Sequence, residues 1–273
     1  MSNENDIMAE LPHYGFVDCI TKAFGNNPVF IGIAVGGSYM DGHLDEYSDL
    51  DIHLVVEEAF ENLKFEEKQA LLATLFLPLC CYSNGNDDRV MVCLYDFNPI
   101  ILHVDWKWQT LKEFEIRVEN PKVLFERDYL LSSIMERTDF SYPLPDIHNI
   151  EPRFWSWMHY VLSKIGRGEL LEANDYLSEV RSCCIGPLIL YKNGMSPRRM
   201  RHAESLPESE WMLLSESILT EFSLEACFNA TTGMIKLYQY LREGYIGEDF
   251  QPLFEAESAC LRYVVYISRK IKS

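Results

Sequence analysis

Two short apolar runs joined by a glycine-serine connector constrain the fold of this chain more than any other feature. Residues 29–36, VFIGIAVG, have the length of a strand and close on glycines. Residues 49–56, DLDIHLVV, alternate polar and apolar side chains before turning fully apolar. Both patterns are typical of core strands. The connector GSYMDGHLDEYS has no continuous periodicity, which predicts a tight turn followed by a short helical piece.

The rest of the first half predicts a helix and a hairpin. Apolar side chains recur at helical spacing across residues 63–79, so we expect a helix there. After the turn-rich stretch SNGNDD at 83–88, two strand-like runs at 89–95 and 100–106 are separated by DFNP, which favours a hairpin. From residue 111 onward, helical patterns take over.

The second half predicts helices alone. A stretch with three prolines at 139–152 marks the boundary between the halves, and residues 153–272 contain no convincing strand. Loops are expected where glycine, asparagine and proline gather, at 166–168, 193–197 and 244–247. We therefore predict an α+β protein, with a small mixed β-sheet domain at residues 1–142 followed by an all-helical domain at residues 143–273.

The charge of the chain is concentrated in its first half. The formal net charge is −18, of which residues 1–142, with 25 acidic and 10 basic residues, carry −15. A field of that sign repels polyanions and attracts cations. It disfavours duplex nucleic acid as a partner and favours metal ions or a polycationic small molecule, although a role in solubility alone explains the charge equally well.

Neither a membrane span nor a disulfide framework is expected. No apolar run reaches the roughly 18 to 20 residues that a membrane helix needs, and the N-terminus, MSNENDIMAELPHYG, lacks a basic region followed by an apolar stretch. We therefore expect a cytoplasmic protein. The eight cysteines show no CxxC spacing, and adjacent pairs such as Cys80 and Cys81 do not match zinc-ligand spacings. They are interpreted as reduced, mostly buried thiols.

The connector and the strand after it carry groups that suit phosphate and metal binding. Asp49 and Asp51 are one residue apart, so on a strand they point to the same face and can share one or two divalent cations. Gly37 and Ser38 offer an unobstructed backbone N–H group and a hydroxyl, which suit a triphosphate. Alone, each feature is usually only a turn or an exposed strand edge. Their combination is what predicts a site.

A third carboxylate, Asp105, lies on the last strand-like run, IILHVDWKW. In a sheet it could come alongside Asp49 and Asp51. It is then a candidate third metal ligand, or the base that takes a proton from an acceptor hydroxyl. The alternative is an ordinary surface charge.

Residues 29–106 resemble the signature of the nucleotidyltransferase superfamily related to DNA polymerase beta. That signature is a Gly-Ser, a short connector, an acid-apolar-acid strand and a third acid on a later strand. It is carried here by Gly37, Ser38, Asp49, Asp51 and Asp105. In length and in its helical second half, the chain also resembles the bacterial aminoglycoside and lincosamide nucleotidyltransferases. It departs from the pattern after Ser38, where Tyr39, Met40 and Asp41 replace the basic residue that members often have.

The resemblance implies magnesium-dependent transfer of a nucleotidyl group, such as AMP from ATP, to a hydroxyl of a small acceptor. An aminoglycoside-like or lincosamide-like antibiotic would be one such acceptor. The aspartates would hold Mg²⁺, and Gly37 and Ser38 would hold the phosphates. Two alternatives remain open, namely transfer to a protein or RNA acceptor, and a catalytically silent nucleotide-binding or interaction module.

Several residues of the second half are further candidates. The resemblance implies a basic residue that holds the triphosphate, for which Lys164 is suited unless it is an ordinary solvated lysine. Trp155, His159 and Leu162 share one helical face, which lines an acceptor cleft or packs into the core. Two charged groups complete the set. An acidic helix face could meet a cationic acceptor or be merely solvated, and a basic run is expected to pair with nearby carboxylates. The acidic helix face consists of Glu169, Glu172, Asp175 and Glu179. The basic run consists of Arg198, Arg199, Arg201 and His202.

Overall fold

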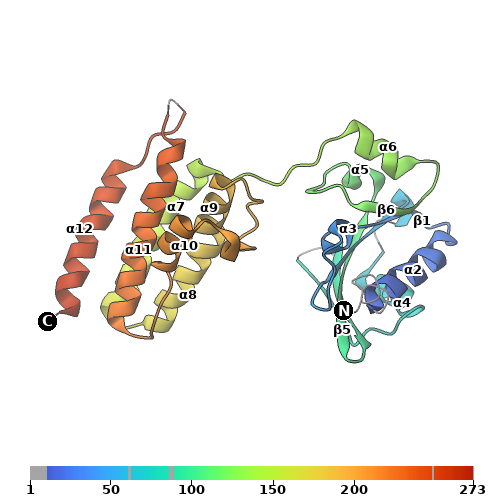
Figure 1. Ribbon diagram of the computed structural model, residues 1–273, viewed down its shortest axis with the longest axis horizontal. Helices are drawn as coiled ribbons and strands as arrows, with labels where there is room; N and C mark the ends of the chain where they lie inside the picture. Colours follow the sequence, from blue (N-terminus) through green and yellow to red (C-terminus); the bar gives the residue numbers. More distant parts are fainter. Residues whose placement is uncertain (1–10, 61–62, 86–88, 248, 273) are drawn as a thin grey trace, which may run out of the picture. The chain divides into compact units, whose positions relative to one another are not determined.

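The computed structural model describes residues 11–60, 63–85, 89–247 and 249–272. The chain divides into two compact units, residues 1–141 and 142–273 (Figure 1). This division falls one residue from the boundary expected between residues 142 and 143. Residues 1–10, on which the expectation about an N-terminal leader rests, and residues 86–88 of the expected turn lie outside the described residues.

The first unit contains a six-stranded sheet in the order β3-β4-β5-β2-β1-β6. Its strands are β1 (Phe30–Val35), β2 (Leu50–Val56), β3 (Cys80–Ser83), β4 (Val90–Phe97), β5 (Ile100–Gln109) and β6 (Lys122–Glu126). β2 and β5 are parallel and the other neighbours are antiparallel. The sheet is therefore mixed, and the α+β prediction is confirmed.

Short helices cover the two faces of this sheet. They are α2 (Pro12–Gly25), α3 (Ser38–Asp41), α4 (Phe65–Ala73), α5 (Leu111–Phe114) and α6 (Leu130–Arg137), with a 3-10 turn at Glu58–Phe60. Side chains of α2 and α4 share the main core with the apolar face of the sheet. On the other face, Phe114 of α5 and Leu131 and Ile134 of α6 pack against Ala34 and Val55.

Alternation along β5 separates an apolar from a polar face. Leu102, Val104, Trp106 and Trp108 are buried, whereas the intervening residues at 103, 105, 107 and 109 are partly exposed. Because successive side chains of a strand point to opposite faces, the partly exposed residues lie away from the core shared with α2. This polar face positions the candidate site.

The second unit is helical, and the described part of residues 142–273 contains no strand. Its helices are α7 (Ile147–Arg167), α8 (Leu170–Val180), α9 (Gly186–Lys192), α10 (Glu208–Ser215), α11 (Leu224–Arg242) and α12 (Phe254–Ile271). A π-helical turn at Arg181–Ile185 joins α8 to α9, and 3-10 turns lie at Ala203–Ser205 and Glu243–Tyr245. Asp146 caps the start of α7, and the helix ends at Gly168 with φ 75°.

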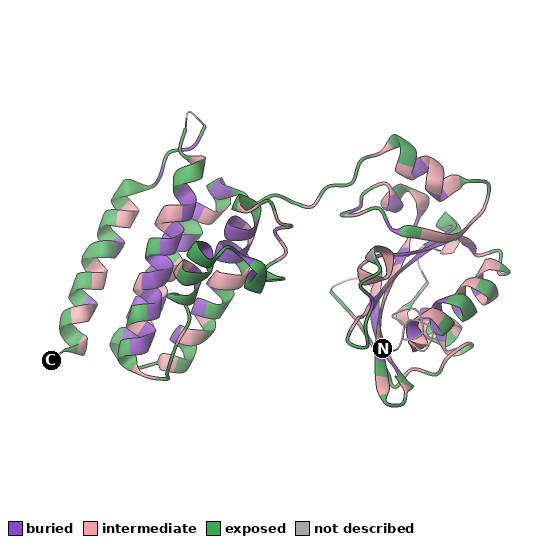
Figure 2. Cartoon of the chain, in the orientation of Figure 1, coloured by how far each residue is buried: buried purple, intermediate pink, exposed green. Residues whose placement is uncertain are grey.

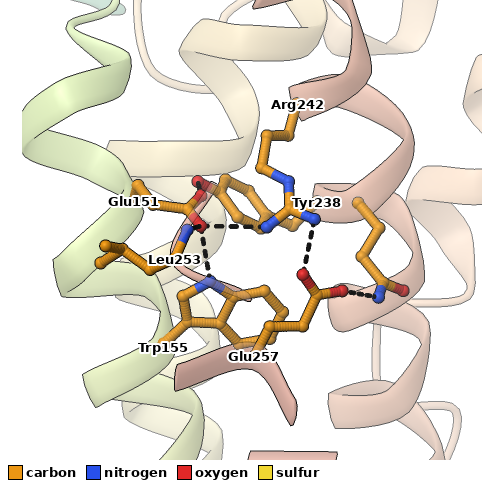
Figure 3. A network of polar contacts seen from close by, with 7 residues as sticks. Glu151, Trp155, Tyr238, Arg242, Leu253 and Glu257 are labelled. Carbon is orange, nitrogen blue, oxygen red and sulfur yellow. Dashed lines mark hydrogen bonds and ion pairs between the residues drawn. The ribbon is translucent and has the colours of Figure 1, made fainter. Parts of the chain in front are cut away.

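A buried polar network ties this unit together (Figure 3). The carboxylate of Glu151 on α7 accepts hydrogen bonds from Trp155 Nε1 at 2.9 Å, from Arg242 Nη1 at 3.0 Å and from the hydroxyl of Tyr238. The backbone N–H of Leu253, just before α12, also donates to it at 2.9 Å. The carboxylate of Glu151 thus links α7, α11 and the start of α12. Trp155, which donates to it, belongs to the hydrophobic core of this unit.

Three local expectations need correction, and one helix was not predicted. The helix predicted at 63–79 spans only Phe65–Ala73, and β3 starts at Cys80. The strand β6 interrupts the helical patterns expected after residue 111, because it pairs with β1 at the sheet edge. The helix α2 was not expected. The cysteines are not all reduced, since Cys81 and Cys93, which lie opposite each other in the β3–β4 ladder, form a disulfide.

No helix within the described ranges combines the length and the apolar character needed to cross a membrane.

Candidate functional site

The site is built where β2 and β5 run side by side. Asp51 on β2 is the register partner of Asp105 on β5, so these two predicted carboxylates lie on adjacent strands. Their side chains are each about a quarter exposed. Asp49 precedes the first residue of β2 and is also partly exposed. The structure therefore brings Asp51 and Asp105 together, with Asp49 at the start of the same strand.

The glycine turn packs directly against Asp51. The N–H of Gly36 donates to the backbone oxygen of Asp51 at 2.8 Å, and the N–H of Gly37 donates to Glu119 Oε1 at 3.0 Å. Gly37 has φ 64° and ψ −149°, a conformation open essentially to glycine alone. A Cβ at Gly37 would lie 2.9 Å from Asp51 Oδ2. The turn thus needs glycine both for its backbone angles and for the space beside the carboxylate.

Ser38 is the first residue of α3. Its hydroxyl oxygen is buried and has no hydrogen-bond partner among the described residues. Buried polar atoms nearly always have partners, so an exception calls for an explanation. A phosphate oxygen would supply the missing partner, in keeping with the role expected of this serine.

Asp51 and Asp105 each have a basic neighbour on β5. Lys107 Nζ lies 2.7 Å from Asp51 Oδ1, and His103 Nε2 lies 3.0 Å from Asp105 Oδ1. Burial raises the pKa of Asp105, and the charge of Asp51 raises it further, although the hydrogen bond from His103 opposes the change. A carboxylate with a raised pKa is a better proton acceptor at neutral pH than an ordinary one.

The polar face continues beyond the carboxylates to a buried histidine. His53 on β2 is buried, and its Nδ1 lies 2.7 Å from Gln109 Oε1. Burial and the nearby charge of Lys107 lower the pKa of His53 to about 4, so the ring is neutral at pH 7. A hollow of about 410 Å³ begins next to Lys107. Its lining includes Asn84, Arg89, Gln109, Glu113 and Ile116.

The donor set fits magnesium in its chemistry. Mg²⁺ prefers oxygen ligands and is usually held by one or two carboxylates together with water and substrate phosphates, which Asp51 and Asp105 beside Ser38 could satisfy. Among the described residues, no cluster of three or more His, Cys, Asp or Glu side chains is arranged to hold a metal. A cation bound to Asp51 would share this carboxylate with, or displace, the ammonium group of Lys107, which lies 2.7 Å from Oδ1.

Four residues of this site were missed by the sequence reasoning: His53, His103, Lys107 and Glu119. The alternation of polar side chains along β5 could have indicated His103 and Lys107, because it places them on the same face as Asp105. Glu119 is in a loop, and its contact with Gly37 joins residues 82 positions apart, which no local pattern reveals.

Lys164 lies in the second unit, in the last turn of α7. Its Nζ is 2.6 Å from Glu169 Oε2 and 5.0 Å from the centre of the Tyr160 ring. Two further residues of the acidic helix face have partners within the unit. Glu172 accepts a hydrogen bond from the hydroxyl of Tyr160, and Glu179 forms an ion pair with Arg199 at 3.7 Å. The pairing expected of the basic run is thus observed for Arg199.

The aromatic face predicted on α7 divides between core and surface. Trp155 and Leu162 are buried in the helical core, which supports the packing interpretation for them. His159 is exposed, and its ring stacks on that of Tyr263 of α12 with centroids 5.1 Å apart.

Comparison with known proteins gives distant structural likenesses but no sequence match. No family model matches the sequence, and no curated protein matches it. The chain resembles the crystal structure of a nucleotidyltransferase-like protein from Exiguobacterium sibiricum 255-15. The similarity covers 82% of this chain and 73% of the other chain, with a TM-score of 0.40 and 14% sequence identity. A likeness this distant carries no argument about activity, which must rest on the residues of the site.

Proposed function

We propose that this protein is a magnesium-dependent nucleotidyltransferase that moves a nucleotidyl group, AMP from ATP, to a hydroxyl of a small acceptor. The observation that carries the proposal is that Asp51 and Asp105 lie opposite each other on adjacent parallel strands, and that the glycine turn at Gly37 packs against Asp51. The partnerless hydroxyl of Ser38, at the end of that turn, supports it. Carboxylates and phosphate-binding groups are thereby within one small region.

Each residue has a defined role in this proposal. Asp49, Asp51 and Asp105 hold Mg²⁺, which neutralises phosphate charge when bound. Gly37 and Ser38 bind the β and γ phosphates. As the alternative to binding the ion, Asp105, whose pKa is raised by burial, takes the proton of the acceptor hydroxyl as that oxygen attacks the α-phosphorus in line and pyrophosphate leaves. Such catalysis depends mainly on positioning and charge neutralisation.

The acceptor is proposed to be a small hydroxylated molecule in the cytoplasm, in the manner of an aminoglycoside or lincosamide. The net charge of −15 on residues 1–142 suits a cationic acceptor. The hollow of about 410 Å³ has the size of a small-molecule site, and Lys107, which lines it, is ion-paired with Asp51.

A second candidate function is a catalytically silent module. It is favoured by one observation, the ammonium group of Lys107 at 2.7 Å from Asp51, where it satisfies the carboxylate without a metal.

The test is a screen for magnesium-dependent pyrophosphate release. Each nucleoside triphosphate is combined with aminoglycosides, lincosamides and other hydroxyl compounds. With an identified acceptor, Asp105→Asn should lower the rate by roughly 10² to 10⁴ because the proton acceptor is lost. Retained Mg-ATP affinity assigns Asp105 as the base, and weakened affinity assigns it as a metal ligand. Wild-type turnover by this variant would exclude both roles, whereas no release with any acceptor would favour the silent module.

A further inference from the structure

The outward face of α12 is apolar although the helix is already packed in the second unit. Cys260 and Ile267 on its inner side are buried. On the outer side, Phe254, Leu261 and Val265 are 61%, 38% and 49% exposed. Figure 2 shows this side of the helix as exposed. The three residues follow one another at helical spacing, so they form a single stripe, which we call the α12 stripe.

The α12 stripe is a shaped surface rather than scattered residues. Its three side chains line one hollow of about 500 Å³ together with Glu257, Ser258 and Arg262 of the same helix and Arg242 of α11. Positions 254, 258, 261, 265 and 268 follow the alternating spacing of four and three residues that is typical of a seam between two helices. A contiguous apolar patch on a folded protein usually marks an interaction site, and this spacing fits a partner helix.

The charges of α12 identify the partner. Its first turn carries the exposed Glu255, its last turn carries Arg269 and Lys270, and Arg262 lies between them, whereas Glu257 is already ion-paired with Arg242. A helix that is acidic at one end and basic at the other complements a copy of itself that runs in the opposite direction. A parallel copy would place like charges side by side.

We propose that two copies of this chain associate through the α12 stripe, with their α12 helices antiparallel about a two-fold axis. Glu255 of each copy then lies opposite Arg262 or Arg269 of the other, on one flank of the apolar seam. Because the same patch serves both copies, the contact closes on itself and yields a dimer rather than a filament. This inference is independent of the proposed function.

The first experiment measures the mass of the full-length protein by sedimentation equilibrium between about 1 and 100 micromolar. The wild type should dimerise. Val265→Asp places a charge in the seam and should raise the dissociation constant by about tenfold or more. The control is Leu171→Asp, a change at an equally apolar exposed residue on α8, and it should leave the dimer intact.

The second experiment tests the direction of the helices by charge exchange. Glu255→Arg alone, or Arg262→Glu combined with Arg269→Glu, should weaken self-association because each homodimer then opposes like charges. An equimolar mixture of the two variants should form heterodimers, since opposite charges face each other again only in the mixed pair. Native mass spectrometry distinguishes the two variants in that mixture.

Three results would overturn the proposal. A wild-type chain that stays monomeric over the whole range shows that the α12 stripe does not join two copies. A dimer that persists with Val265→Asp places the interface elsewhere. A mixture of the charge variants without heterodimers excludes the antiparallel arrangement.

Discussion

Replacing Gly37 by alanine should disturb both the stability of the first unit and the position of Asp51. The backbone at Gly37, with φ 64° and ψ −149°, lies in a region essentially closed to other residues, and forcing alanine into it costs about 1 to 3 kcal/mol. The new Cβ would also lie 2.9 Å from Asp51 Oδ2, which is too close for that oxygen to stay. The carboxylate must therefore shift from its position beside the turn.

Gly42 provides the matched control. It also has a positive φ, 71°, but its ψ of 15° places it in the ordinary left-handed region, and no atom lies within 4 Å of its would-be Cβ. Gly42→Ala should therefore cost only about 1 to 2 kcal/mol and leave Asp51 in place.

Hydrogen exchange of peptides from residues 1–141, followed in urea, measures the stability of this unit without interference from the helical one. The affinity for Mg-ATP, measured by titration, reports on the position of the Asp51 carboxylate, which is a proposed ligand of the magnesium ion. We expect Gly37→Ala to weaken Mg-ATP binding by about tenfold, equivalent to 1.4 kcal/mol, and Gly42→Ala to leave it unchanged. Equal effects of the two substitutions on both measurements would refute the argument that the turn is fitted to Asp51.

Two further predictions concern buried charges. Arg242→Met leaves Glu151 buried without its counterion and should destabilise the helical unit by about 3 to 5 kcal/mol in urea titrations, whereas Lys236→Met, at an exposed position of the same helix, should change stability by less than about 0.5 kcal/mol. A loss no larger than that of the control would contradict a structural role for the network. Folding lowers the pKa of His53 from the ordinary 6.5 to about 4, so the unfolded state binds this proton more tightly than the folded state. The free energy of unfolding of the first unit therefore decreases as the pH falls from 6.5 towards 4. This loss should reach about 2 kcal/mol between pH 7.5 and pH 5 and be absent in His53→Gln, as measured by the same hydrogen exchange.

The elements next to the site could be predicted because local patterns determine them. The runs at 29–36 and 49–56 became β1 and β2, and the hairpin became β4 and β5. Asp105 was expected to come alongside Asp51 because both aspartates lie on strand-like runs that can be neighbours in a sheet. The two residues are register partners on β2 and β5.

The remaining features depend on contacts between distant segments. The short strand β6 exists because it pairs with β1, and its five residues have no periodicity that distinguishes them from a helix. The Cys81–Cys93 disulfide depends on the register of β3 against β4, which a spacing of 12 residues does not reveal. The ion pair between Lys107 and Asp51 likewise requires β2 and β5 to be neighbours.

The most direct test of the proposed site is calorimetric titration of Mg-ATP into the wild type and Asp51→Asn. Glu225→Gln, at an exposed carboxylate of α11, serves as the control. Removing one charged metal ligand should weaken Mg-ATP binding by about tenfold or more, and chelation of magnesium should abolish the binding that Asp51 supports. Glu225→Gln should bind like the wild type. If Asp51→Asn binds Mg-ATP as tightly as the wild type, with the same dependence on magnesium, Asp51 is not part of a metal-nucleotide site and the proposed function is wrong.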